Sequence, residues 1–269
     1  MARSPLLDGL SGYGAPRTRR GLSTSYGPPP WHMTGRTIAI WYKAADPGEV
    51  RRHIPQHLRV DDDPIVRARF WDMRHDAGLG DAWPAHYPEQ PTFREAVVAF
   101  PVHVNGELAD YPTYMYSDDP TYVAFGRETM GWPVRMGAID VSPPLPSPQL
   151  KPGVVLTGEL RKSSVSVMRA SLTLTSKAQE KPPSRLPRWI STRVVPRVDS
   201  SEPELVQLVE SGPDNVRWGQ IWDADAVLEF DESPGDELHF LKPREIVAAQ
   251  YWSSVELVVG FGRVLEVDD

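Results

Sequence analysis

Glu95 combines the residue type and the setting expected of a group that transfers protons. It begins an apolar stretch, residues 95–104, whose composition predicts a strand. A carboxyl group in an apolar pocket keeps its proton to higher pH and can then act as a general acid or base. The alternative is a structural glutamate that faces solvent or pairs with Arg94 or Arg135.

Two arginines, Arg36 and Arg135, could stabilise negative charge on a substrate. A guanidinium group can donate paired hydrogen bonds to a carboxylate or enolate oxygen. Together with Glu95, they form the set that we predict to be catalytic. A solvent-facing strand position for Arg36 and a surface salt bridge for Arg135 remain open.

Several other chemistries lack their sequence signatures. The chain has no cysteine, which excludes disulfides and thiolate chemistry and fits a reducing cytoplasm. The histidines at 53, 57, 75, 86, 103 and 239 lack metal-ligand spacing, and we expect His53 and His57 to be exposed on a helix and no metal to be bound. There is no glycine-rich phosphate loop and no Gly-x-Ser-x-Gly motif, so we predict no cofactor.

Composition indicates a β-rich globular protein. Of 269 residues, 40% are hydrophobic, which suffices for a core, and 28 are prolines, which disfavour long helices. The net charge of −7 without a basic stripe argues against nucleic acid as a partner. No apolar run is long enough to span a membrane, so we predict a cytoplasmic protein with no membrane partner.

The elements that must position these residues are mostly strands. Residues 1–31 predict an irregular arm, and residues 32–269 a single domain. We expect a helix at 47–57 and strands at 37–43, 65–73, 95–104, 111–116, 138–141, 154–160, 165–175, 189–195, 205–210, 215–230 and 247–261. Asn105 and Gly106 favour a type I′ hairpin turn. Asp119 and Pro120 predict the start of a helix over 121–130, which Gly131 would end.

Three motifs around this helix resemble those of a known family. Residues 114–120 (YMYSDDP), 126–128 (GRE) and 131–133 (GWP) are similar in order and spacing to a stretch of the acetoacetate decarboxylases. Shorter similarities extend the resemblance from about residue 36 to about residue 262. The resemblance implies a mainly β (α+β) fold, a β-barrel or cone with a few short helices and a closed apolar pocket, commonly assembled into homo-oligomers.

The resemblance breaks at the reactive position. Family members carry two lysines after the proline that corresponds to Pro133, and the first lysine forms a Schiff base with the substrate. Here these positions are Val134 and Arg135. Valine cannot form an imine, and arginine remains protonated at physiological pH. The reaction would therefore have to proceed without that lysine, unless another lysine, such as Lys43 or Lys162, replaces it.

The same resemblance assigns further pocket residues. Glu95 corresponds to a pocket carboxylate, and Arg36 lies within one residue of an arginine that holds the substrate carboxylate. Trp132 replaces a pocket tyrosine, and Phe70 is the aromatic residue at or next to the position of a second glutamate. With Val134 and Met115, Trp132 and Phe70 are our predicted substrate-binding residues.

These assignments predict an enzyme of secondary metabolism. We expect a cyclase or lyase that performs cyclisation, cycloaddition or dehydration on a polyketide-like or oxo-acid intermediate, as in antibiotic biosynthesis. Its partner would be a largely apolar small-molecule substrate. The alternatives are a small-molecule binding protein without catalysis and a decarboxylase with a relocated lysine.

Overall fold

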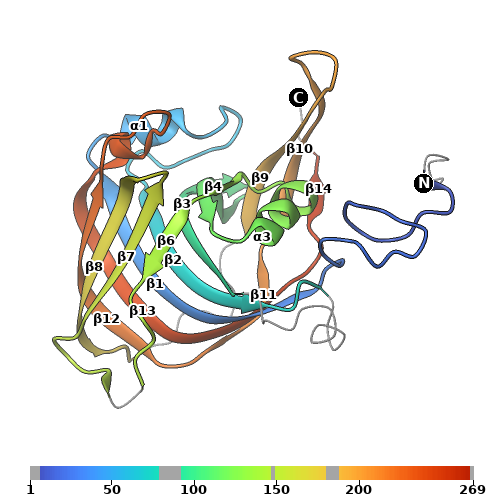
Figure 1. Cartoon of the computed structure of the whole chain (residues 1–269). Helices are drawn as coiled ribbons and strands as arrows, with labels where there is room; N and C mark the ends of the chain where they lie inside the picture. The colour runs from blue at the N-terminus through green and yellow to red at the C-terminus, as the bar shows by residue number, and fades with distance from the viewer. Residues whose placement is uncertain (1–6, 79–91, 147–148, 180–187, 267–269) are drawn as a thin grey trace.

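The computed structural model describes residues 7–78, 92–146, 149–179 and 188–266. Its main element is a 14-stranded sheet with the strand order β14-β10-β9-β4-β3-β2-β1-β13-β12-β8-β7-β6, while β5 and β11 pair with β4 and β13 (Figure 1). Most neighbouring strands are antiparallel, and β6 curls back to contact β2 and β3. The mainly β fold with few short helices confirms the expected class.

Most strands extend further than the sequence patterns predicted, whereas β6 has the predicted bounds 138–141 and β13 ends before the predicted residue 261. Their bounds are β1 Trp31–Ala44, β2 Ile65–His75, β3 Thr92–Val104, β4 Glu107–Ser117, β5 Val134–Met136, β6 Ala138–Val141, β7 Val155–Lys162, β8 Val165–Lys177, β9 Trp189–Pro196, β10 Pro203–Ser211, β11 Pro213–Trp218, β12 Ile221–Phe230, β13 Pro243–Val259 and β14 Arg263–Leu265. The predicted strand 215–230 is wrong as one unit, because β11 and β12 are separate strands on either side of Gly219. Asn105 and Gly106 have φ of 52° and 81°, as the hairpin turn requires.

The helices are shorter than predicted. Helix α1 covers Pro47–Arg52 and ends before residue 57. Helix α3 covers Pro120–Phe125, and its N-cap Asp119 accepts hydrogen bonds from the backbone N–H groups of Thr121 and Tyr122. A single π-helical turn, η3, continues over Gly126–Met130, and Gly131 ends it with a φ of 70°. The 3₁₀ turn η5 covers Leu238–Leu241. Within the described ranges, no helix is long and apolar enough to cross a bilayer.

Each face of the sheet carries its own hydrophobic cluster, because successive side chains of a strand point to opposite faces. The Phe70 cluster includes Ile38, Phe70 and Tyr116, and the Trp71 cluster includes Trp71, Met115 and Trp252. We call the two sides of the sheet the Phe70 face and the Trp71 face.

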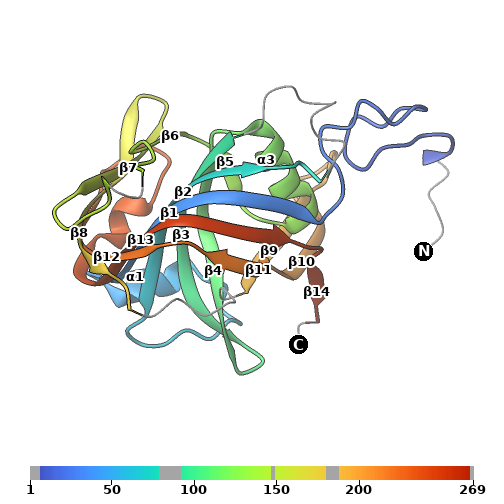
Figure 2. The same ribbon diagram turned by 90° about the horizontal axis from the view of Figure 1, so that it is seen from below.

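Residues 7–30 form an irregular arm beside the sheet, as Figures 1 and 2 show. Tyr26 fixes its end to the body of the protein. The Tyr26 ring is buried and packs edge-on against Trp31 and Phe125, and its hydroxyl donates to Glu128 at 2.5 Å. The arm therefore contacts the helical segment that precedes Val134.

Candidate active site

Glu95 lies on the Trp71 face of β3, directly opposite Trp71 on β2. Only 3% of its surface is exposed. The hydroxyl of Tyr122, from the first turn of α3, donates to Oε1 of Glu95 at 3.0 Å. The Asp119 cap that starts α3 thereby also positions the residue that contacts the carboxyl group.

Burial changes the acid–base behaviour of this pair. Loss of hydration raises the pKa of the Glu95 carboxyl to about 8, although the Tyr122 hydrogen bond and the positive charge of Arg69 lower it. Burial and the neighbouring Glu95 hold the pKa of Tyr122 well above its usual value. Glu95 is therefore mostly protonated at neutral pH, whereas the Tyr122 hydroxyl keeps its proton.

A small, mostly apolar cavity of about 30 Å³ adjoins Glu95. We call it the Glu95 cavity. Its lining residues are Met33, Trp71, Met73, Phe93, Glu95, Tyr122, Trp132, Trp189, Pro213, Leu257 and Val259. Met33 and Leu257 also line a larger open groove of about 800 Å³. These two side chains therefore lie between the groove and the cavity.

Aromatic rings form most of the cavity wall. Phe93 stacks on Tyr122 with ring centroids 4.2 Å apart, and Trp132 packs edge-on against Trp189 at 5.1 Å. The indole of Trp132 donates to the hydroxyl of Ser211 at 2.7 Å. Such rigid walls can fix the shape of an unsaturated ligand.

A group of buried charges lies on the same face. Arg67 forms an ion pair with the fully buried Asp110, and Nη2 of Arg69 lies 3.8 Å from the same carboxylate. Burial, together with the positive charge of Arg67, lowers the pKa of Arg69 to about 9, although the Glu95 carboxylate raises it. Both arginines still carry a positive charge at neutral pH.

The structure brings some of the predicted site residues together. Glu95 and Trp132 line the Glu95 cavity. Val134 and Met115 are fully buried in the Trp71 cluster and pair with each other across β5 and β4, but they do not line the cavity.

Phe70 and Arg36 lie on the other face of the sheet. Phe70 packs against Gly158, where a Cβ would come within 2.7 Å of the ring. The aromatic residue that reaches the cavity is Trp71. Arg36 follows the alternation of β1 to the side of Ile38, and its Nε and Nη2 donate to Asp72 at 2.8 and 2.5 Å.

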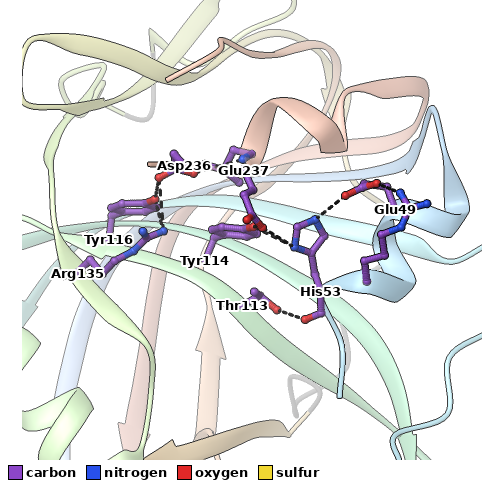
Figure 3. A network of polar contacts seen from close by, with 10 residues as sticks. Glu49, His53, Thr113, Tyr114, Tyr116, Arg135, Asp236 and Glu237 are labelled. Carbon is purple, nitrogen blue, oxygen red and sulfur yellow. Dashed lines mark hydrogen bonds and ion pairs between the residues drawn. The ribbon is translucent and has the colours of Figure 1, made fainter. Parts of the chain in front are cut away.

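Arg135 also points to the Phe70 face, where it joins the network drawn in Figure 3. Its guanidinium donates to the Tyr116 hydroxyl and lies 3.5 Å from Asp236. In the same network, Nδ1 of His53 lies 3.0 Å from the Tyr114 hydroxyl. The prediction that His53 is exposed was wrong, since its side chain is only 5% exposed.

Three of the described lysines contact groups outside the Glu95 cavity. Lys43 pairs with Asp63 at 2.9 Å, Lys162 donates to the carbonyl of Gly235 at 2.8 Å, and Lys177 lies over the ring of Trp222. No lysine is among the described residues that line the Glu95 cavity. Lys181 and His86 lie outside the described ranges.

Sequence reasoning missed most of the cavity wall. Tyr122 could have been found, because the Asp119-Pro120 start places it in the first turn of α3. Trp189, Pro213 and Leu257 come from distant strands, and no local signal links them to Glu95.

Comparisons with known proteins place the chain in a family. The family model described as acetoacetate decarboxylase (ADC) matches residues 14–267, and the chain therefore belongs to the acetoacetate decarboxylase family. Acetoacetate decarboxylase 1 of Bradyrhizobium diazoefficiens is 26% identical over 245 residues, which cover 89% of this chain and 88% of the relative. Acetoacetate decarboxylase of Ralstonia nicotianae is 25% identical over 249 residues, covering 90% and 91%.

Solved structures share the whole fold. The enduracididine biosynthesis enzyme MppR superposes with a TM-score of 0.85 at 25% identity, covering 99% of this chain and 98% of MppR. Other MppR structures hold pyruvate, or the condensation product of pyruvate and imidazole 4-carboxaldehyde. An acetoacetate decarboxylase-like enzyme from Sphingomonas wittichii RW1 has the same fold, with a TM-score of 0.84 at 21% identity.

Proposed function

We propose that the chain is an enzyme that works without a Schiff base and uses Glu95 as its general acid and base. The observation that carries the proposal is a buried carboxyl group with a pKa of about 8 at the wall of an aromatic cavity. A group whose pKa lies near the working pH is available in both protonation states. The identity of Val134 at the position after Pro133 supports a reaction without the family lysine.

The reaction we propose is a dehydration or cyclisation of an oxo-acid or polyketide-like intermediate in secondary metabolism. The MppR structures with pyruvate and its condensation product support this substrate class. In a dehydration, protonated Glu95 gives its proton to the leaving hydroxyl as the C–O bond breaks. The resulting carboxylate takes the proton from the adjacent carbon, which forms the double bond and restores Glu95.

Substrate entry requires the cavity to widen. Its volume of about 30 Å³ has room for two or three water molecules, since each needs roughly 10–15 Å³. Met33 separates the cavity from the open groove, and a methionine side chain can adopt several shapes at low cost. We therefore propose that substrate enters from the groove past Met33 and Leu257.

The test is incubation with the aldol adduct of pyruvate and imidazole 4-carboxaldehyde, which carries the leaving hydroxyl, followed in parallel by product analysis and by borohydride reduction with intact mass measurement. We expect the dehydrated product, no protein adduct, and a loss of about a hundredfold or more in Glu95→Gln. Acetoacetate decarboxylase 1 of Bradyrhizobium diazoefficiens is the positive control for adduct trapping.

Two results would contradict the proposal. A borohydride-stable adduct on a lysine of this chain would indicate a relocated Schiff base. Ligands that bind and return unchanged, with Glu95→Gln altering affinity alone, would indicate a binding protein.

A further inference from the structure

Buried hydrogen-bond donors without acceptors gather around the Glu95 cavity. Nε and Nη1 of Arg69 and the indole Nε1 atoms of Trp71 and Trp189 are buried, and none has a partner among the described residues. Both tryptophans line the cavity. Most buried polar groups in proteins are hydrogen-bonded, and Trp132 in the same wall follows this rule through Ser211. These four atoms are donors, and the carboxylate oxygens of Asp110, which also lack a hydrogen bond within the described ranges, are already engaged in the ion pair with Arg67. The group that would satisfy the four donors must therefore supply further acceptors.

The charges around Arg69 are also unbalanced. Its distance of 3.8 Å to Asp110 is too long for a hydrogen bond, and Asp110 forms its ion pair with Arg67. Glu95 is mostly protonated at neutral pH and contributes little negative charge. The two buried arginines thus share one carboxylate, and a buried charge without a partner is costly. A negatively charged ligand would remove this imbalance.

The strand register puts Arg69 within reach of the cavity. Trp71 pairs with Glu95 across β2 and β3, and Arg69 pairs with Val97 on the same face. Arg69 and Glu95 are therefore diagonal neighbours, which lie about 7–8 Å apart and are bridged by long side chains. The influence of the Arg69 charge on the Glu95 carboxyl is consistent with this placement.

We propose that Arg69 and the indole N–H groups of Trp71 and Trp189 form an anion subsite of the Glu95 cavity that holds the carboxylate of an oxo acid. The proposal rests on the proposed function, because it takes this cavity as the reaction site. A carboxylate brings one negative charge and several acceptor positions, matching what the donors lack. Glu95 then remains free to exchange protons with the other end of the substrate.

The experiment compares pyruvate with its uncharged ester, methyl pyruvate, by titration calorimetry. Wild-type protein should bind pyruvate more tightly than the ester. Arg69→Met should weaken pyruvate binding by about 10- to 100-fold, the effect of losing hydrogen bonds to a charged group, and leave ester binding unchanged. Trp71→Phe, which removes one neutral donor, should weaken pyruvate binding by about 2- to 10-fold. Arg69→Lys should restore part of the loss.

The matched control is Arg36→Met, which removes a buried arginine from the Phe70 face and should leave both affinities unchanged. Melting temperatures without ligand supply a second measurement. Arg69→Met should melt no lower than wild type, because Arg69 is too far from Asp110 for a hydrogen bond and Asp110 keeps its ion pair with Arg67. Arg36→Met should melt lower, because it removes two hydrogen bonds to Asp72 and leaves that carboxylate without its main partner.

Several outcomes would overturn the anion subsite. These are a folded Arg69→Met that binds pyruvate as wild type does, an ester that binds as tightly as the acid, or wild-type protein that does not bind pyruvate. Equal turnover of acid and ester, lost in Glu95→Gln, would overturn the subsite and leave the proposed function intact. Binding of pyruvate through Arg69 without turnover would overturn only the proposed function.

Discussion

The two faces of the sheet differ in how they hold buried charge. On the Phe70 face, Arg36 donates two hydrogen bonds to Asp72, and Asp236 accepts from the Tyr116 hydroxyl and from the backbone N–H of Leu238. On the Trp71 face, Arg69 has two nitrogen atoms without partners. Arg36 thus holds its carboxylate through two hydrogen bonds and leaves only Nη1 without a partner among the described residues, whereas Arg69 lies 3.8 Å from Asp110, leaves Nε and Nη1 without partners, and is close to a cavity.

This difference separates structural from functional charges better than residue type does. Arg36, Arg69 and Arg135 are all arginines at or near buried strands, and no sequence pattern singled out Arg69. A guanidinium whose donors already have protein acceptors contributes to folding. A guanidinium whose donors lack protein acceptors can still bind a ligand, although its buried charge destabilises the folded protein.

The largest loss of stability should come from removing a charge partner on the Phe70 face. Asp236→Ala leaves the Tyr116 hydroxyl without its acceptor and removes the partner of Arg135. Removing one partner of a buried charge pair typically costs about 3–5 kcal/mol, and we expect the low end because Arg135 is partly exposed. Urea denaturation measures the change in the free energy of unfolding. Loss of less than about 1 kcal/mol would mean that these pairs are not structural.

A second effect belongs to the cavity side and depends on pH. The folded-state pKa of Glu95 is about 8, above its unfolded value of 4.5, so the folded protein binds more protons between these two values. The contribution of the Glu95 carboxyl to the free energy of unfolding is fully present below pH 4.5. It falls as the pH rises to about 8, by up to about 1.4 kcal/mol per pH unit.

Glu95→Gln removes this titration and should reduce the fall in stability between pH 5 and pH 8. Because glutamine resembles the protonated acid, the variant should match wild type at pH 5 and be more stable at pH 8. Thermal melts of both proteins at these two pH values check this. Parallel pH curves would mean that Glu95 titrates normally.

Most of the fold, but only two of the residues that line the Glu95 cavity, could be predicted from the sequence. Strands β2 and β8 follow local alternation and β3 is a continuous apolar run, so local patterns predicted them. The Asp119 and Gly131 caps likewise fix the ends of the helical segment. Glu95 and Trp132 were found because family motifs carry them. The choice between Phe70 and Trp71 depends on which face of β2 meets Glu95, and this pairing register is a tertiary property that no local pattern encodes.

The smallest effect should come from a charge on the cavity side that does have partners. Asp119 accepts from the N–H groups of Thr121 and Tyr122 and lies 2.8 Å from Nε2 of His75, and these contacts keep its pKa low despite burial. If satisfied charges are structural on either face, Asp119→Ala should cost about 1 kcal/mol, the usual value of an N-cap.

Asp119→Asn is the matched control, because asparagine caps a helix about as well as aspartate does. It should therefore recover most of the stability in urea denaturation. Since α3 carries Tyr122, the alanine variant should also loosen the hydrogen bond to Glu95 and lower activity more than Asp119→Asn does. Equal stability and activity in the two variants would show that the cap does not position Tyr122. The unpartnered donors of Arg69 would then be the remaining evidence that the two faces of the sheet differ in function.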